Sequence, residues 1–220
     1  MNDALEPPIK KRRGCLFYGC LGGLVMLLII VIAGLVGLRY AKKMVTDFTD
    51  SAPTPLPGVK LSPAEIEVVR KRIEDFRQAV RAQRPTEPLS LTTDEINALI
   101  ATDSDLEPFK GKVYVSIEGE QLKGQVSIPM AEVGLRAFRD RYLNGAGTFK
   151  LAVRNGLLYL TAQTIDVKGK PLPEVYMQKI RTQNLARNLN NDPRASAALD
   201  RIKDIQVKDG KVVIVPKENQ

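Results

Sequence analysis

The chain of 220 residues is basic, with 33 lysine and arginine residues against 25 aspartate and glutamate residues and a formal net charge of +8. It contains no histidine, no tryptophan and only two cysteines, Cys15 and Cys20. Without histidine there is no histidine general acid or base, no Ser-His or Cys-His nucleophile and no zinc site built on histidine. We therefore expect no enzyme, catalytic residue, cofactor or metal site, and, since no DNA or RNA motif is visible, no nucleic-acid partner.

The N-terminal region predicts a membrane anchor. Residues 1–14 form a short tail that ends in four consecutive basic residues, and residues 15–38 are 24 consecutive residues without a charge. A helix of that length reaches about 36 Å, against about 30 Å for the hydrocarbon core of a bilayer. The basic block predicts that the N-terminal tail is cytoplasmic and that residues 39–220 lie on the extracytoplasmic side of the membrane. A cleaved signal peptide is disfavoured, because the apolar run is too long and no small-residue cleavage site follows it.

Two glycines within this segment suggest a helix-packing face. Gly19 and Gly23 form a small-xxx-small pair, which lets two membrane helices approach closely and would support a homodimer. Glycine is also common in membrane helices that do not associate, so this spacing leaves both interpretations open.

The remaining chain is expected to contain a linker and one domain. Residues 39–60 read as a juxtamembrane segment and a proline-rich linker, residues 61–216 as the domain, and residues 217–220 as a polar tail. Ser62, Pro63 and Glu65 predict a helix start with a capping box. An apolar stripe at helical spacing then extends to about residue 83, and it could pack on its own domain or pair with a second copy as a short coiled coil: Ile66, Val69, Ile73, Phe76 and Val80.

Three two-residue loops predict β-hairpins, at Gly119-Glu120, Asn155-Gly156 and Asp209-Gly210. Pairing outward from each loop places apolar residues opposite one another on one face, and a shift of one residue would destroy this match. The expected pairs are Ile117 with Leu122, Val113 with Val126, Val153 with Leu158, Leu151 with Leu160, Phe149 with Ala162, Val207 with Val212, and Ile205 with Ile214.

We therefore expect an α+β fold: an N-terminal transmembrane helix followed by one antiparallel sheet of about six long strands with inserted amphipathic helices. A curved sheet of this kind could hold an acyl chain or another apolar ligand, or its side chains could simply form a closed core. The residues that would line such a site are Val113, Val115, Ile117, Leu122, Val126, Phe149, Leu151 and Leu160.

Two short segments resemble a known family. The segment from Leu91 to Ile100 (LTTDEINALI) and the segment from Val167 to Pro173 (VKGKPLP) are similar to those of YpmS-like bacterial single-pass envelope proteins. More distantly, residues 89–180 resemble LmeA-like periplasmic proteins with a tubular lipid-binding fold. The resemblance implies a site for lipid or another apolar ligand, and it transfers no individual functional residue.

The sequence thus favours a membrane-anchored extracytoplasmic domain of a bacterial envelope that is not an enzyme and binds lipid or another apolar ligand. Its basic charge would draw it to anionic lipid or anionic wall polymers. The alternative is a structural or interaction protein of a membrane complex, which would associate through the helix of residues 62–83 or through the glycine face at Gly19 and Gly23.

Overall fold

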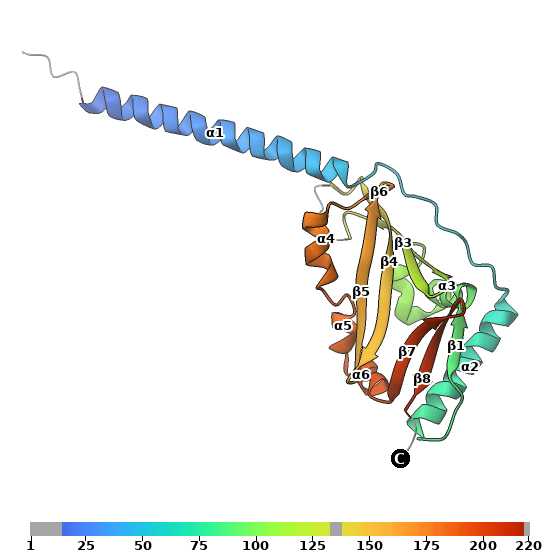
Figure 1. Ribbon diagram of the computed structural model, residues 1–220. Coiled ribbons are helices and arrows are strands. Elements are labelled where there is room, and N and C mark those ends of the chain that lie inside the picture. Colours follow the sequence, from blue (N-terminus) through green and yellow to red (C-terminus); the bar gives the residue numbers. More distant parts are fainter. Residues whose placement is uncertain (1–14, 133–137, 218–220) are drawn as a thin grey trace, which may run out of the picture. The chain divides into compact units, whose positions relative to one another are not determined.

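The computed structural model describes residues 15–132 and 138–217, without the side chains of residues 15–25 and Met44. The chain divides into two units, residues 1–47 and 48–220. In chain order the described elements are α1 (Cys15–Asp47), α2 (Pro63–Arg81), β1 (Leu89–Thr92), α3 (Thr93–Thr102), the short helix η1 (Ser104–Phe109), β2 (Val113–Glu118), β3 (Gln121–Pro129), β4 (Tyr142–Arg154), β5 (Leu157–Val167), β6 (Lys170–Pro171), α4 (Glu174–Arg181), α5 (Arg187–Asn190), α6 (Pro193–Leu199), β7 (Ile202–Lys208) and β8 (Lys211–Pro216) (Figure 1).

The first unit contains α1, and the predicted transmembrane helix is corrected here. Among the residues whose side chains are described, no helix is both long enough and apolar enough to cross a membrane. Within that part of α1 the uncharged run covers residues 26–38, and Arg39, Lys42 and Lys43 follow it. A membrane-spanning helix needs about 20 apolar residues. The proposed packing residues Gly19 and Gly23 belong to the part of α1 whose backbone alone is described, and the tail of residues 1–14 lies outside the described residues.

The second unit is α+β, but its strands form two sheets and not the single sheet expected. The larger sheet has the order β2-β3-β4-β5-β6, and the smaller has the order β1-β8-β7, all with antiparallel neighbours. The expectation of one sheet was wrong because the last hairpin pairs with β1, about 120 residues earlier in the chain. A hairpin loop fixes the pairing inside the hairpin, and it carries no information about which distant strand lies beside it.

All three predicted hairpins are confirmed in their predicted register. Ile117 lies opposite Leu122, Leu151 opposite Leu160, and Val207 opposite Val212. The two Asx-Gly loops have positive φ at both central residues, 52° and 75° at Asn155 and Gly156, as a type I′ turn requires. A fourth turn of this kind, at Lys168-Gly169, joins β5 to β6 and was not predicted.

Helix α2 begins as its sequence predicts and packs on its own domain. The Ser62 hydroxyl accepts a hydrogen bond from the Glu65 amide, and the Glu65 carboxylate accepts one from the Ser62 amide. Its apolar stripe faces the main core cluster, in which Phe76 is 8% exposed. That cluster joins α2, the small sheet, α6 and the tip of the β4–β5 hairpin: Val69, Phe76, Leu89, Leu91, Val153, Leu199 and Ile202.

Asparagine side chains cover both long edges of the larger sheet. On β2, Asn97 of α3 donates to the Val115 carbonyl at 2.6 Å and accepts from the Val115 amide at 2.9 Å. On β5, Asn184 accepts from the Leu160 amide and donates to the Leu158 carbonyl. Each side chain offers one donor and one acceptor, so Asn97 replaces a neighbouring strand at Val115 and Asn184 does so between Leu158 and Leu160. Helix α3, which carries Asn97, and the connection between α4 and α5, which carries Asn184, therefore cover part of each edge of the sheet.

Candidate functional site

The eight predicted lining residues share one face of the larger sheet. Residues 113, 115 and 117 of β2 lie opposite residues 126, 124 and 122 of β3, and Leu122 lies opposite Phe149 of β4. All eight side chains are half-buried, and none belongs to the main core cluster. The face that carries them is therefore apolar and only partly covered, while their role in binding stays a prediction.

Phe149 lies over glycines on this face. A Cβ atom at Gly124 would come within 3.0 Å of the Phe149 ring, and one at Gly147 within 3.4 Å of it. The aromatic ring therefore occupies the space that side chains at the two glycines would fill. The ring therefore accounts for the missing side chains at Gly124 and Gly147, whereas a Cβ atom at the neighbouring Gly145 would instead lie 3.1 Å from the Asp166 backbone oxygen.

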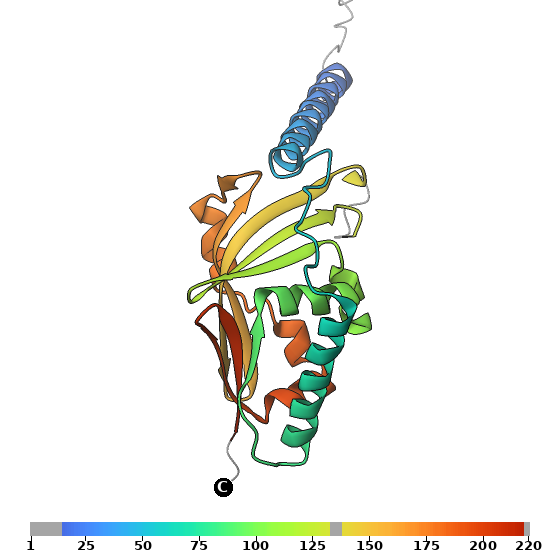
Figure 2. The same ribbon diagram turned by 90° about the vertical axis from the view of Figure 1, so that its right-hand side faces the viewer.

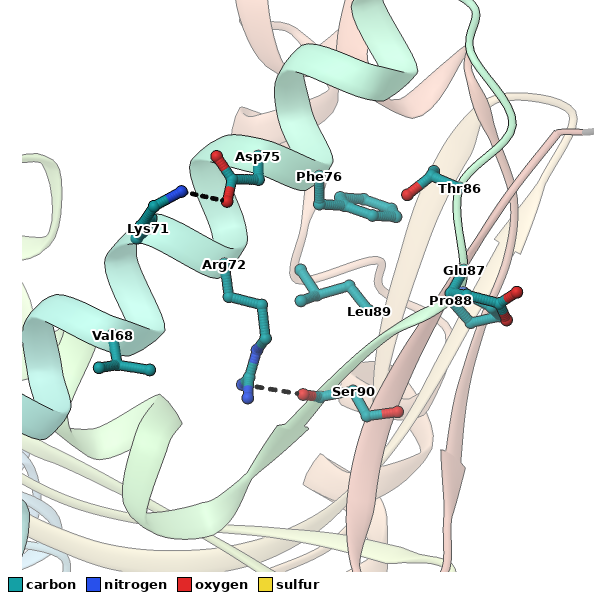
Figure 3. A pocket seen from close by; sticks show the side chains of 10 residues that line it. All are labelled: Val68, Lys71, Arg72, Asp75, Phe76, Thr86, Glu87, Pro88, Leu89 and Ser90. Atoms are coloured by element: carbon teal, nitrogen blue, oxygen red, sulfur yellow. Dashed lines mark hydrogen bonds and ion pairs between the residues drawn. The ribbon is translucent and has the colours of Figure 1, made fainter.

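A groove lies between α2 and the segment that leads into β1 (Figure 3). Its volume is about 680 Å³, within the usual range for a ligand site. Its apolar lining comes from Val68 and Phe76 of α2 together with Pro88 and Leu89. The remaining lining residues are polar or charged: Lys71, Arg72, Asp75, Thr86, Glu87 and Ser90.

The groove borders the free edge of β1. Because Lys208 and Lys211 close a two-residue hairpin loop, alternation along β8 turns the backbone of Val212 and Ile214 toward β1. Their partners on β1 are Leu91 and Leu89. The backbone N–H and C=O of Ser90 therefore point away from β8, and Figure 3 shows the Ser90 carbonyl facing α2. Figure 2 shows α2 running alongside β1, with residues 82–88 joining them.

Arg72 connects α2 to both β1 and α3. Its Nη2 atom lies 2.7 Å from Glu95 Oε1 and donates to the Ser90 carbonyl at 3.2 Å. Glu95 also accepts from the Thr92 amide at 2.8 Å, as the second half of the capping box of α3. Burial raises the pKa of Glu95, but the hydrogen bonds from Thr92 and Arg72 outweigh burial and leave that pKa below its ordinary value of 4.5.

This lowered pKa predicts a pH dependence of stability. The charged form of Glu95 is favoured in the folded state, so its contribution is fully present above the unfolded pKa of about 4.5 and is lost as the pH falls through the folded pKa. Urea unfolding of the wild type and of Glu95→Gln between neutral pH and about pH 3 measures this contribution. We expect the wild type to be the more stable at neutral pH and the difference to vanish in acid; a constant difference would contradict the assignment.

Other lowered pKa values belong to helix starts and mark no site. Hydrogen bonds from Ser62 lower the pKa of Glu65, and those from the Ala195 and Arg194 amides lower the pKa of Asp192. Within residues 15–132 and 138–217 there is no group of three or more histidine, cysteine, aspartate or glutamate side chains that could hold a metal ion.

A second polar feature holds the segment that follows α1 on the larger sheet. Asn144 of β4 is 7% exposed and uses all of its hydrogen-bonding capacity there. Its oxygen accepts from the Thr54 amide and the Ser127 hydroxyl, and its nitrogen donates to the Asp50 carboxylate and the Ala52 carbonyl. Asp50 also forms two backbone hydrogen bonds with Tyr142, at 2.9 and 2.8 Å. Tyr142 lies two residues before Asn144 on β4. Residues 49–54 are thus an integral part of the domain.

Neither the groove nor the Asn144 cluster was predicted from the sequence. Arg72 was not singled out in the sequence, although its side chain reaches the β1 edge. One local signal did mark that edge: Pro88 directly precedes the short run from Leu89 to Leu91, and proline in a sheet is confined to edges and strand starts.

Comparison with known proteins gives no assignment for this arrangement. The chain matches no protein-family model, no curated protein and no solved structure, so its resemblance to YpmS-like and LmeA-like proteins stays a prediction.

Proposed function

We propose that residues 48–220 form a non-enzymatic binding domain and that the groove between α2 and β1 is its site for an apolar ligand. The observation that carries this proposal is the exposure of Val68, which is 66% accessible on α2 beside the apolar lining of Phe76, Pro88 and Leu89. Apolar side chains that remain accessible in a concave surface are typical of ligand sites.

The charges around the groove favour a neutral ligand. Lys71 is paired with Asp75 at 2.7 Å, and Arg72 is paired with Glu95 at the same distance. The two cations are therefore largely compensated, and they give the groove no strong preference for an anion. The ligand is expected to bind through apolar contacts and local hydrogen bonds.

The half-buried face of the larger sheet is the second candidate for an apolar ligand such as an acyl chain. It is favoured by the eight residues that lie outside the main core cluster. Association through the apolar stripe of α2 is less favoured, because Ile66, Val69 and Phe76 are buried within the domain.

The two candidate sites are distinguished by titration with the neutral fluorescent apolar probe N-phenyl-1-naphthylamine. We expect Val68→Asp to weaken probe binding at least about fivefold, because a charge in the groove must be desolvated when the probe binds. Val175→Asp on α4 is the matched control, since Val175 is also a helical valine and is 71% exposed. Equal binding by the wild type and both variants would reject the groove and leave the sheet face as the candidate.

A further inference from the structure

We propose that the groove ligand is an extended peptide segment that adds as a strand to the free edge of β1. This inference rests on the proposed function and names the class of ligand. It follows from the backbone groups that line the groove, which an acyl chain could not use and which a peptide backbone matches.

The edge of β1 offers a short ladder of backbone groups. The N–H and C=O of Ser90 point away from β8, and alternation directs the Pro88 carbonyl to the same side. At Thr92 the ladder ends, because the Thr92 amide already donates to Glu95. An added strand would therefore be centred on Ser90 and would span about four residues, or about 13 Å.

Arg72 occupies this edge in a way that a peptide can replace. Its contact with the Ser90 carbonyl, at 3.2 Å, is longer than its ion pair with Glu95, at 2.7 Å. The guanidinium can keep Glu95 as a partner when a peptide N–H takes over the Ser90 carbonyl. Pro88 and Arg72 then act as edge protection in the free protein, since both discourage unspecific strand pairing.

The side chains around the groove set the composition of the peptide. Alternate residues of an added strand point to opposite faces. One set of side chains would contact the apolar residues Phe76 and Leu89, which lie on the α2 side of β1 (Figure 3). The other would face outward and is expected to be polar. The larger sheet offers no comparable opening at residues 115 and 158–160, because Asn97 and Asn184 already bind the backbone there.

The test uses the full chain and a short acetylated peptide of alternating valine and threonine, with a terminal lysine for solubility. Two twins of the peptide carry N-methyl groups, one on the valine amides and the other on the threonine amides. Successive N–H groups of a strand point to opposite edges, so only one twin blocks the edge that faces β1. We expect one twin to bind about tenfold more weakly or worse and the other to bind like the parent peptide.

Two further readouts locate the peptide. In NMR spectra the Ser90 amide resonance should shift and its hydrogen exchange should slow when the parent peptide binds. Arg72→Met, which removes the competing donor and keeps an unbranched side chain, should tighten peptide binding about two- to tenfold, the equivalent of one displaced hydrogen bond. A fold check by circular dichroism accompanies this variant, because it also removes the ion pair with Glu95.

The outcomes separate this inference from the proposed function. Equal binding of both methylated twins, or a Ser90 amide that does not respond, would overturn strand addition. Failure of the parent peptide to bind, while the fluorescent probe still depends on Val68, would overturn the peptide and leave the apolar site. If the probe is also indifferent to Val68→Asp, both proposals fail.

Discussion

Replacing Gly147 by alanine should lower the free energy of unfolding by about 2 to 3 kcal/mol. A Cβ atom at this position would lie 2.5 Å from the backbone oxygen of Thr164, and backbone cannot move aside as a flexible side chain can. The close approach arises at the irregularity in the β4–β5 pairing between Thr148 and Phe149. The clash would force the two longest strands of the larger sheet apart at their middle.

Urea unfolding followed by circular dichroism measures this change. The matched control is Gly58→Ala, where no atom lies within 4 Å of the added Cβ and the backbone has no positive φ. We expect this control to stay within about 0.5 kcal/mol of the wild type. A similarly small effect at Gly147 would show that β4 and β5 are farther apart than described.

Replacing Asn144 by leucine is expected to destabilise the domain by about 2 to 4 kcal/mol. The substitution leaves the Thr54 amide, the Ala52 carbonyl and the Ser127 hydroxyl without the partner that Asn144 provides. An unpaired buried polar group costs more than a hydrogen bond contributes, because its desolvation is no longer compensated. Residues 49–54 should then detach from the sheet before the domain unfolds.

Hydrogen exchange detects this detachment separately from global unfolding. In the wild type the Asp50 amide donates to the Tyr142 carbonyl, and the Thr54 amide donates to the side chains of Ser127 and Asn144. Both amides should therefore exchange slowly. In Asn144→Leu both amides should exchange faster, while the amides of β4 and β5 should exchange at the same rates as in the wild type. Gln125→Leu is the control, because Gln125 is exposed on the same face of the neighbouring strand. Unchanged exchange at residues 49–54 would contradict the role given to Asn144.

Local patterns were sufficient to predict the hairpins and the start of α2. Asn155-Gly156 and Asp209-Gly210 fix both the turn and the register of the strands that flank them, so the pairing of Leu151 with Leu160 follows from the sequence alone. Ser62, Pro63 and Glu65 likewise specify a helix start within four residues. Each of these features depends on neighbours in the chain, which a sequence displays directly.

The groove and the division into two sheets depend on residues that are far apart in the chain. Leu89 pairs with Ile214, and Arg72 reaches Ser90 across a loop. Asn144 reads in the sequence as an ordinary polar residue next to a glycine, although its partners Thr54 and Asp50 lie 90 and 94 positions earlier in the chain. Such long-range contacts are determined by the packing of the whole domain, so no local sequence pattern predicts them.

The asparagine side chains on β2 and β5 also bear on how the protein behaves when it is concentrated. Asn97 and Asn184 bind the outward backbone groups of Val115, Leu158 and Leu160 on β2 and β5, so these groups cannot pair with a strand from another molecule. Two molecules that collide would then find few free backbone groups for strand pairing along that sheet. A substitution that removed either side-chain amide would expose these backbone groups again, and fibrillar or amorphous aggregation would be its first sign.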